Sequence, residues 1–412
     1  MNVAIISVGT ELLFGQIVNT NSVYLSKQLN MLGFNVMFHH TVGDNEERLA
    51  DTLKESLKRC DIVITTGGLG PTEDDMTKET VCAVLEDELV EHEPSRKALE
   101  NLARKRKYGK LTPNNYKQTM MPSRAVVLPN PGGTAPAFAL ELKGKYVVSL
   151  PGPPREMISI FEKEVKPFLQ PFMDGTIVYR VLRLFGIGES TIETKLMDMI
   201  DAQTDPTIAT YAKEGECSIR VASKRKNKKE AESAVEGVTN LIKDRLSEYI
   251  FSYDDEDLAY VVAKKLMEND ITFSLAESCT GGRLAAKITS IPGISKVFDR
   301  GLVTYTKKAK IDELDVGADI IEKFSVYSKE TALGMVEGLS EKTGSKLCVS
   351  VTGILEANSH FANLVPGSAY VGIKYDGKVH DELIQGRNIN REWNANYLVL
   401  AILNLINKTL TV

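Results

Sequence analysis

The chain has 412 residues, a length that predicts two or three domains rather than one. Hydrophobic residues make up 43% of it, and the net charge of −5 provides no general attraction to nucleic acids or anionic lipids. Five scattered cysteines without a CxxC pair argue against structural zinc or a disulfide framework and favour a reducing compartment. The sequence also lacks a signal-peptide pattern and an apolar run of membrane-spanning length. We therefore expect a soluble, cytoplasmic protein.

Residues 1–171 alternate short strand patterns with helical patterns. This alternation predicts a three-layer α/β domain with a mostly parallel sheet covered by helices on both faces. In such a sheet, ligands bind at the carboxyl ends of the strands. The expected strands are 2–8, 34–41, 61–66, 136–141 and 145–150, and the expected helices are 20–32, 45–58, 76–86, 93–106 and 154–170.

Residues 172–252 have a different pattern, which predicts a small α+β domain, and residues 253–412 are predicted to form a second α/β domain. Residues 252–257 are expected to link the two. The smaller domain has expected strands at 177–185, 207–212 and 218–222 and helices at 189–200 and 229–245. The last domain has expected helices at 258–269 and 391–408, and strands ending at 278 and lying at 302–305, 346–351, 368–375 and 378–385.

The segment from Thr65 to Asp75, TTGGLGPTEDD, is the most informative one, and we call it the glycine-acid loop. Its glycines follow a buried strand, where backbone amides can approach a ligand closely, and the helix that follows adds a positive dipole. Its three acids suit a divalent cation that bridges to phosphate oxygens. A tight turn with an acidic helix cap is the alternative. Three glycines, a proline and three acids exceed what a cap needs, so we favour a ligand site.

Two other loops follow predicted strands, and we expect them to meet the glycine-acid loop in one cleft. Gly9–Asn21 is a long polar stretch, which is more typical of a binding loop than of a connector. Gly43–Asp44 follows the second strand. The rigid segment Asn130–Pro136 offers further backbone donors, and Pro151–Met157 places Arg155 beside the mouth, although prolines at a helix start are also ordinary punctuation.

Common nucleotide-binding fingerprints are missing from the sequence. There is no GxxxxGK[ST] P-loop, and Gly186-Ile187-Gly188 lacks the third glycine and the acidic partner of a Rossmann motif.

In the last domain, Ala276–Gly282 places Ser278 at a strand end just before a helix, where backbone amides could hold an oxyanion. A serine nucleophile needs a base, and no histidine lies nearby in the sequence. Lys310 with a lowered pKa, and Tyr305 as a relay, could take that role. From the residues alone, Ser278 as a helix cap and Lys310 as a solvated surface charge are the favoured interpretations.

These N-terminal segments together resemble the CinA family, whose N-terminal domain is similar to the molybdopterin-binding MoaB/MogA fold. The resemblance implies metal-dependent hydrolysis of ADP-ribose, with Mg²⁺, Mn²⁺ or Co²⁺ as cofactor. Hard oxygen ligands for the cation would come from Glu11, Asp44, Asp74 and Asp75, and Asp74 and Asp75 are also candidates for the catalytic base. The matching segments are Gly9–Asn21, Val42–Asp44, Thr66–Asp75, Asn130–Phe138 (with Ala137 where the family has glycine) and Pro151–Met157. The expected substrate-binding residues are Asn19, Asn21, Gly67, Gly68, Gly70, Thr72 and Arg155.

The last domain looks like the CinA C-terminal domain, a nicotinamide mononucleotide (NMN) deamidase. In the family the serine is the nucleophile and the tyrosine and lysine act in acid-base roles, which implies catalytic roles for Ser278, Tyr305 and Lys310. The matching segments are Ala276–Gly282, Phe298–Gly301, Val303–Tyr305 with Lys310, and Thr352–Ile354. The expected substrate-binding residues are Thr280, Gly281, Gly282, Thr352 and Gly353, with Arg387 and Arg391 placed to fork a phosphate or carboxylate.

One segment departs from the family pattern. After Thr352–Ile354 the family continues Ala-Gly-Pro and a glycine-containing loop, whereas this chain has Leu355–Gly367 without that proline and with a single glycine at its end. Backbone amides then approach the substrate less closely, and Glu356 repels its phosphate. The departure predicts an impaired deamidase site.

The middle domain resembles the family's KH-like domain through Gly186–Ser190 and Pro206–Ala209. A GxxG loop is missing, and the basic runs Lys224–Lys229 and Arg104–Lys107 are typical of solvated turns and helix ends. We therefore expect this domain to act as a spacer or in dimerisation. For the whole protein we expect ADP-ribose and NMN as ligands, a homodimer as the assembly, and no nucleic-acid or membrane partner. Two alternatives stay open: a non-catalytic nucleotide-binding protein associated with competence or DNA damage, and a molybdopterin-binding protein like MoaB.

Overall fold

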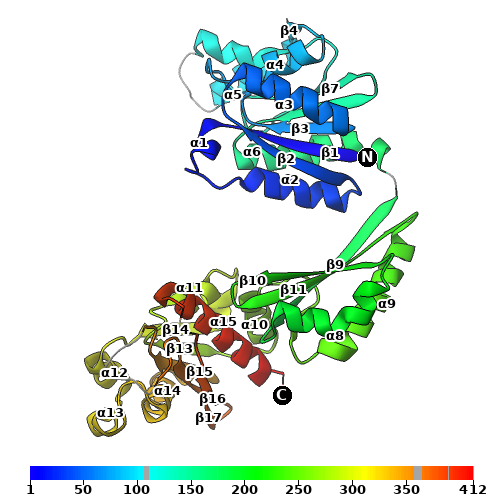
Figure 1. The fold of residues 1–412 in the computed structure, drawn as a ribbon. Coiled ribbons are helices and arrows are strands. Elements are labelled where there is room, and N and C mark those ends of the chain that lie inside the picture. Colours follow the sequence, from blue (N-terminus) through cyan, green and yellow to red (C-terminus); the bar gives the residue numbers. More distant parts are fainter. Residues whose placement is uncertain (106–110, 174, 357–363, 388, 412) are drawn as a thin grey trace. The chain divides into compact units, whose positions relative to one another are not determined.

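Figure 1 shows the computed structural model, which describes residues 1–105, 111–173, 175–356, 364–387 and 389–411. The chain separates into two compact units. The first contains residues 1–178 and 223–233, and the second contains residues 179–222 and 234–412.

The first unit is built on a six-stranded sheet with the order β2-β1-β3-β8-β7-β6. β2, β1, β3 and β8 run parallel, whereas β7 pairs antiparallel with both β8 and β6. The central strands β1 and β3 are apolar along most of their length because both of their faces are buried. The predicted mostly parallel α/β fold is confirmed. The strands are β1 (Asn2–Val8), β2 (Asn35–Val42), β3 (Ile62–Thr66), β6 (Val126–Leu128), β7 (Ala137–Leu142) and β8 (Lys145–Leu150).

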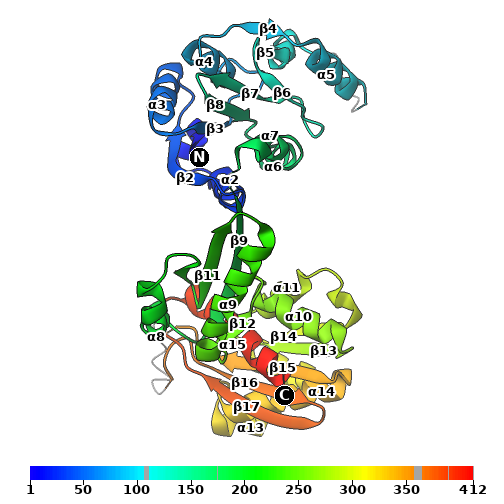
Figure 2. The ribbon, with the colours of Figure 1, turned by 90° about the vertical axis from the view of Figure 1, so that its right-hand side faces the viewer.

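Helices cover both faces of this sheet, as Figure 2 shows. One face packs against α2 (Thr20–Met31), α6 (Pro154–Ile160) and the π-helical segment Phe161–Val165 that leads into α7 (Lys166–Leu169). The other face packs against α3 (Glu46–Arg59) and α4 (Thr77–Val84) through Leu49, Leu53 and Val81. The three predicted layers, helices, sheet and helices, are therefore present, and the ends of the strands lie between the two helical layers.

Several short elements of this unit are not predicted from the sequence. They are β4 (Leu89–Glu91), which pairs with β5 (Met120–Pro122), the 3-10 helix η1 (Pro113–Thr119) and the four-residue helix α1 (Thr10–Leu13). α5 (Glu93–Lys105) agrees with the prediction. The expectation of a polar loop over Gly9–Asn21 is wrong, since this stretch contains α1 and exposes the apolar side chains of Phe14 and Val18.

A sheet of order β10-β11-β9-β12 and two helices lie mostly in the second unit, although residues 176–178 of β9, 223–225 of β11 and 228–233 of α9 belong to the first. The elements are β9 (Thr176–Phe185), α8 (Glu189–Asp201), β10 (Thr207–Lys213), β11 (Glu216–Arg225), α9 (Lys228–Leu246) and β12 (Ile250–Ser252). The predicted small α+β domain is confirmed.

The rest of the second unit is a five-stranded sheet of order β14-β13-β15-β16-β17 with helices around it. The expected strand 302–305 is wrong: β14 ends at Val303, which leaves Thr304 and Tyr305 in the turn before α12. The helix expected just after Ser278 is present as α11, whereas α12 to α14 were not predicted. The strands are β13 (Phe273–Glu277), β14 (Phe298–Val303), β15 (Leu347–Gly353), β16 (Ala369–Tyr375) and β17 (Lys378–Ile384). The helices are α10 (Leu258–Glu268), α11 (Arg283–Thr289), α12 (Lys307–Leu314), α13 (Ala318–Phe324), α14 (Lys329–Thr343) and α15 (Arg391–Thr409).

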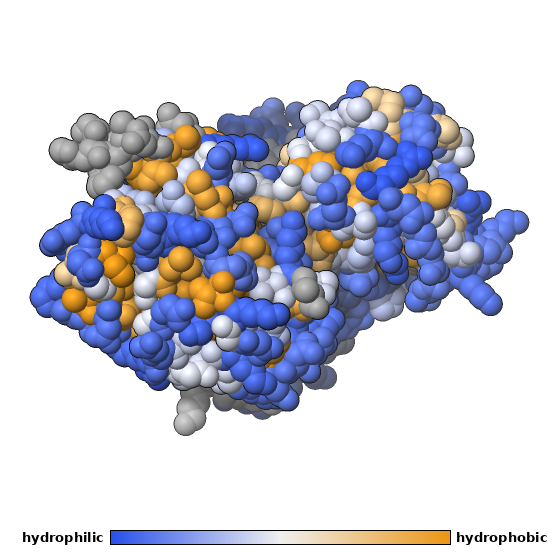
Figure 3. Space-filling view, turned by 90° about the horizontal axis from the view of Figure 1, so that it is seen from below, coloured by the Kyte–Doolittle hydropathy of each residue, from blue (hydrophilic) through white to orange (hydrophobic). Residues whose placement is uncertain are grey.

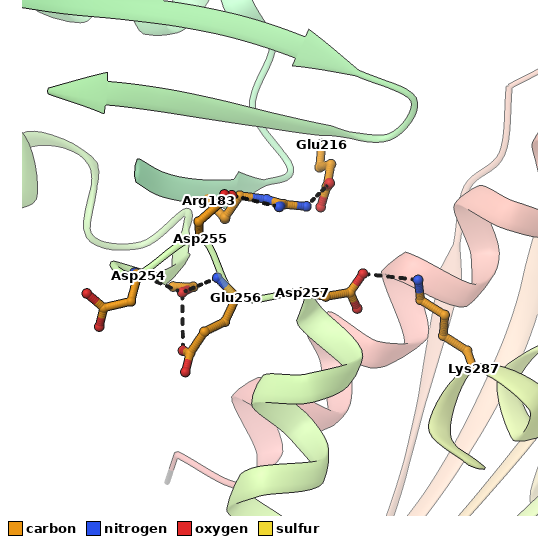
Figure 4. Close-up of polar contacts among 8 residues, drawn as sticks. Arg183, Glu216, Asp254, Asp255, Glu256, Asp257 and Lys287 are labelled. Carbon is orange, nitrogen blue, oxygen red and sulfur yellow. Dashed lines mark hydrogen bonds and ion pairs between the residues drawn. The ribbon is translucent and has the colours of Figure 1, made fainter. Parts of the chain in front are cut away.

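The segment 252–257 joins the two sheets of this unit and is held by specific contacts (Figure 4). The buried Arg183 of β9 binds the carboxylates of Asp255, at 3.0 Å, and Glu216. Asp257 caps α10 and forms an ion pair of 3.0 Å with Lys287. One hydrophobic core contains Phe185 of β9 and Phe251 of β12 together with residues of α10 and α15. The two sheets are therefore one packed body.

Within the described residues, no helix combines the length and apolar character needed to cross a membrane. On the face drawn in Figure 3, hydrophobic side chains are interspersed among hydrophilic ones.

Candidate functional site

The carboxyl ends of β1 and β3 border a cavity of about 590 Å³ in the first unit. As the sheet topology predicts, the glycine-acid loop meets the loops after β1 and β2 there. The predicted residues that line the cavity are Glu11, Asn19, Asn21, Asp44, Gly67, Gly68, Gly70, Asp74 and Asp75. Thr72 and Arg155 are not among its lining residues. Glu156 and the buried Gln118 do line the cavity, although the sequence analysis did not predict them. We call this space the N-terminal cavity.

The glycines of the loop are required by close contacts at the strand end. Gly67 has φ +109° and Gly68 has φ +68°, and a Cβ on Gly67 would lie 2.1 Å from the carbonyl oxygen of Val8. The amide of Gly67 donates to Leu150 O at 3.0 Å, so it is unavailable to a ligand. In the described part of the chain, the amides of Gly68 and Gly70 make no hydrogen bond and remain as the loop's donors to an anion.

Two of the five acids that line the cavity hold the loops together. The carboxylate of Asp44 accepts hydrogen bonds from the Thr10 amide (2.9 Å) and hydroxyl (2.7 Å), which ties the first loop to the second. The carboxylate of Asp75 accepts from the Thr72 amide at 2.9 Å and from its hydroxyl, and it closes the turn over Gly70. This explains the role of Thr72, which is to fix Asp75.

Asp74 lies in the same turn. The Thr72 side chain, although its hydroxyl is bonded to Asp75, also lowers the pKa of Asp74, as do its own backbone amide and the ammonium of Lys117, so this carboxylate is ionised at neutral pH. It is an anionic group at the cavity wall, suited to a cation.

The donor set suits a cation that shares its coordination with a phosphate. Over the residues that the structure describes, no three His, Cys, Asp or Glu side chains come together as a preformed metal cage. Mg²⁺ commonly takes one or two carboxylates and completes its octahedron with phosphate oxygens and water. The cavity offers Glu11, Asp44, Asp74 and Asp75 for that purpose.

The two asparagines of the first loop mainly secure α2. Asn19 caps the helix by accepting from Ser22 N at 3.0 Å, and its amide donates to Ser7 Oγ at 2.8 Å. Asn21 is buried and donates to Thr66 Oγ1 (2.9 Å) and Gly152 O (2.8 Å). Their amide donors are therefore committed to the strand ends that form the cavity.

The second predicted site centres on a buried serine and lysine. The ammonium of Lys310 donates to Ser278 Oγ at 2.9 Å and to the carbonyl of Thr304 at 2.7 Å. Lys310 is 1% exposed and Ser278 3% exposed. Burial lowers the pKa of Lys310 to about 8. A lysine with this pKa is substantially neutral in mildly alkaline solution and can then act as a base toward the hydroxyl.

The turn that carries Ser278 is organised by Glu277, which sequence reasoning missed. The buried carboxylate of Glu277 accepts from the amides of Gly282 (3.1 Å), Leu284 (3.1 Å) and Ala285 (2.7 Å) at the start of α11. These amides are thus unavailable as oxyanion donors. Gly281 and Gly282 have φ +60° and +90°, which suits glycine at this tight turn.

Two neighbours of Ser278 are buried with it. Thr280 is fully buried, and its hydroxyl has no hydrogen-bond partner within the described residues. Burial raises the pKa of the Cys279 thiol to about 12, so this cysteine is protonated and is not a competing nucleophile.

Tyr305 does not bond to the serine-lysine pair. Its hydroxyl accepts from Arg391 Nη2 at 2.7 Å, and the same guanidinium lies 3.7 Å from the carboxylate of Glu356. Arg387 lies over the Trp393 ring at 5.9 Å. The predicted arginine pair is therefore present at the start of α15, with Arg391 already partnered by an acid.

Thr352 and Gly353 have packing roles at the end of β15. Thr352 donates to Val326 O at 2.6 Å, and a Cβ on Gly353 would lie 2.3 Å from Ser368 O of the neighbouring chain segment. Of the altered segment Leu355–Gly367, residues 357–363 lie outside the described part. Leu355 is held by a hydrogen bond of 2.9 Å from Asn394 Nδ2 to its carbonyl.

Family models match almost the whole chain in three consecutive pieces. Residues 4–171 match the probable molybdopterin binding domain, residues 179–252 the damage-inducible protein CinA KH domain, and residues 255–410 the CinA C-terminal domain. A competence-damage inducible relative from Acetivibrio thermocellus is 45% identical over 97% of this chain and 96% of its own length. A CinA-like protein from Dictyoglomus turgidum is 44% identical over 92% of each chain.

Among solved structures, a CinA protein of unknown function from Thermoplasma acidophilum is similar in part. It is 33% identical, covers 40% of this chain and 96% of its own, and has a TM-score of 0.37.

Proposed function

Since the chain belongs to the CinA family of competence-damage inducible proteins, we propose that it is a hydrolase of pyridine-nucleotide recycling with two separate sites. The N-terminal cavity would cleave ADP-ribose to AMP and ribose 5-phosphate. The Ser278 site would convert NMN to nicotinate mononucleotide and ammonia, at a rate reduced by its altered loop. A homodimer is part of the proposal.

The first activity rests on one observation, the meeting of free backbone amides and acids in the N-terminal cavity. The amides of Gly68 and Gly70 would receive phosphate oxygens, and the cavity acids would hold Mg²⁺, Mn²⁺ or Co²⁺. When bound there, the cation supplies Lewis-acid chemistry at the phosphoryl group. Asp44 and Asp75 keep the loops in register through their bonds to Thr10 and Thr72.

The test is AMP formation from ADP-ribose with Mg²⁺ by the wild type and by an Asp74→Ala/Asp75→Ala double variant. We expect AMP from the wild type, at least a hundredfold less from the double variant, and an unchanged rate from Asp51→Ala, which removes an exposed acid of α3. Loss of activity in the presence of EDTA and its return with Mg²⁺ would follow from the same proposal. An undiminished rate in the double variant would refute it.

The second activity rests on the buried contact between Lys310 and Ser278. Neutral Lys310 would accept the Ser278 proton as Oγ attacks the carboxamide carbon, and would then deliver it to the departing nitrogen as ammonia leaves. Water would hydrolyse the resulting ester, which releases the carboxylate and restores the hydroxyl. The amides of Cys279 and Thr280 are the remaining candidates for oxyanion donors, because the amide of Gly281 donates to Ser278 O and Glu277 accepts from the amides of Gly282 and Leu284.

Ammonia release from NMN tests this second activity. We expect release by the wild type and by Ser290→Ala, which removes a hydroxyl that donates to the carbonyl of Lys287, and none by Ser278→Ala. Release that persists in purified Ser278→Ala would remove this serine as the nucleophile.

Two binding roles are the alternatives, and each has an observation in its favour. The pairing of Arg391 with Glu356 favours a nucleotide-binding protein without turnover at the second site. The match of residues 4–171 to a probable molybdopterin binding domain favours a pterin ligand in the N-terminal cavity. Calorimetric titration with ADP-ribose and with a pterin separates these roles, since tight binding of either without product formation would replace the hydrolase proposal.

A further inference from the structure

Lys117, which does not line the N-terminal cavity, holds the glycine-acid loop through hydrogen bonds to its backbone. The ammonium of Lys117, in η1, donates to the carbonyl oxygens of Thr72 at 3.0 Å and Asp75 at 2.5 Å. It also lies 3.6 Å from the carboxylate of Glu79 in the first turn of α4. Lys117 therefore bridges the two ends of the acidic part of the loop and the helix that follows it.

A second lysine fixes the first. Lys78 of α4 is 1% exposed, and its ammonium donates to the backbone carbonyl of Lys117 at 2.6 Å. The backbone of η1 is thus bound to α4 at the position from which the Lys117 side chain reaches the loop. Burying an ammonium that donates to a backbone carbonyl costs free energy. In this case the buried group anchors the backbone of Lys117.

Two observations distinguish positioning from direct phosphate binding. An ammonium has three donors; two of those of Lys117 bond to Thr72 O and Asp75 O, and its charge is paired with Glu79 at 3.6 Å. Lys117 is also missing from the residues that line the cavity, whereas its neighbour Gln118 lines it.

The loop carries three consecutive acids, Glu73 to Asp75, whose mutual repulsion opposes a compact turn. The ammonium of Lys117 lies close to these acids and binds the carbonyl groups of Thr72 and Asp75. Asp74 and Asp75 contribute to the cavity wall. We propose that Lys117 is a positioning residue that holds the glycine-acid loop in its ligand-binding conformation before a cation or phosphate arrives. This inference rests on the proposed function of the cavity.

The experiment compares the full-length wild type with Lys117→Met, Lys117→Arg and Lys58→Met. Lys58→Met is the matched control, because it removes an exposed ammonium that, among the residues the structure describes, pairs with Glu55 on α3. Hydrogen exchange of the segment 69–77 is measured without metal or substrate. Binding of MnCl₂ alone is then titrated by calorimetry, and kcat and KM for ADP-ribose are determined.

We expect amide exchange in segment 69–77 to be roughly tenfold faster or more in Lys117→Met, since charge-assisted hydrogen bonds to the loop are lost. Affinity for Mn²⁺ should fall by about 10- to 100-fold, as for groups that orient metal ligands. The value of kcat should fall more than KM rises. Lys117→Arg should recover part of each loss, because a guanidinium can serve two carbonyls, and Lys58→Met should behave as wild type.

Unchanged loop exchange in a folded Lys117→Met protein would overturn the inference. So would a rise in KM alone with exchange unchanged, since that pattern indicates direct contact with the substrate. If Lys117→Met does not fold, Lys78→Met applies the same exchange measurement to the anchoring step. Exchange needs no turnover, so a wild type that fails to hydrolyse ADP-ribose would refute the proposed function while the exchange result still decides the role of Lys117.

Discussion

The ammonium of Lys310 lies 2.9 Å from the hydroxyl of Ser278, and both side chains are almost completely buried. No carboxylate forms an ion pair with Lys310 among the residues that the structure describes. Burial therefore lowers its pKa to about 8 without the opposing effect of an ion pair. This contact and the lowered pKa are what the proposed role of Lys310 as the base requires.

The rate of ammonia release should follow the ionisation of Lys310. Because the neutral amine is the base, kcat/KM for NMN should rise with pH and level off above about 8. Lys310→Met should abolish the activity, and Lys310→Arg should do the same since a guanidinium stays protonated. A profile in the wild type that is flat between pH 6 and 9 would exclude Lys310 as the base.

Lys78 should make the stability of the first unit depend on pH. Its pKa is about 8 in the folded protein and near 10.5 when unfolded, so the unfolded chain binds more protons between these values. The penalty of burying the charge is fully present below pH 8 and is relieved as the pH rises from 8 to 10.5. The difference in melting temperature between wild type and Lys78→Met should therefore shift in favour of the wild type over this range, as calorimetry can measure. A difference in melting temperature that stays constant between pH 8 and 10.5 would contradict this role of Lys78 in the pH dependence of stability.

Glu277→Gln should weaken the Ser278 site without touching the substrate. The amide group offers a single acceptor oxygen where the carboxylate serves three backbone N–H groups, so the turn before α11 should loosen. We expect a loss of about 1–3 kcal/mol in stability and roughly tenfold slower ammonia release. Thermal unfolding and steady-state kinetics measure both, with the exposed Glu341→Gln of α14 as control. Full activity in Glu277→Gln would show that the turn does not need its carboxylate.

Removing Glu356 should improve binding of NMN. Its carboxylate lies 3.7 Å from Arg391, and both side chains are about half exposed, so the pair is weak but reduces the positive charge offered to a phosphate. In a Ser278→Ala background, Glu356→Ala should bind NMN severalfold more tightly by calorimetry. Glu392→Ala, which removes an exposed acid next to Arg391, should change little. Equal affinities in the two variants would mean that Glu356 does not oppose the phosphate.

Much of the fold follows from local patterns. The apolar runs of β1 and β3 and the helical pattern of α3 predicted their elements to within a residue or two. The shift of β14 to Phe298–Val303 was not predictable, because its register is set by pairing with β13 rather than by its own residues. The helices α12 and α13 are short, so their apolar positions form no clear period.

The sequence by itself determined the α/β architecture, the glycine-acid loop at a strand end and the candidacy of Ser278 and Lys310, because hydrophobic period and turn chemistry are local properties. Only the tertiary structure decided that Lys310 is buried against Ser278, that Gly67 has no free amide, that Thr72 serves Asp75, and that Lys117 and Glu277 hold the two loops. Most of these are contacts between residues separated in the sequence or depend on which atoms packing leaves free. Burial, and with it the pKa of a lysine, is a property of the packed environment rather than of the residue.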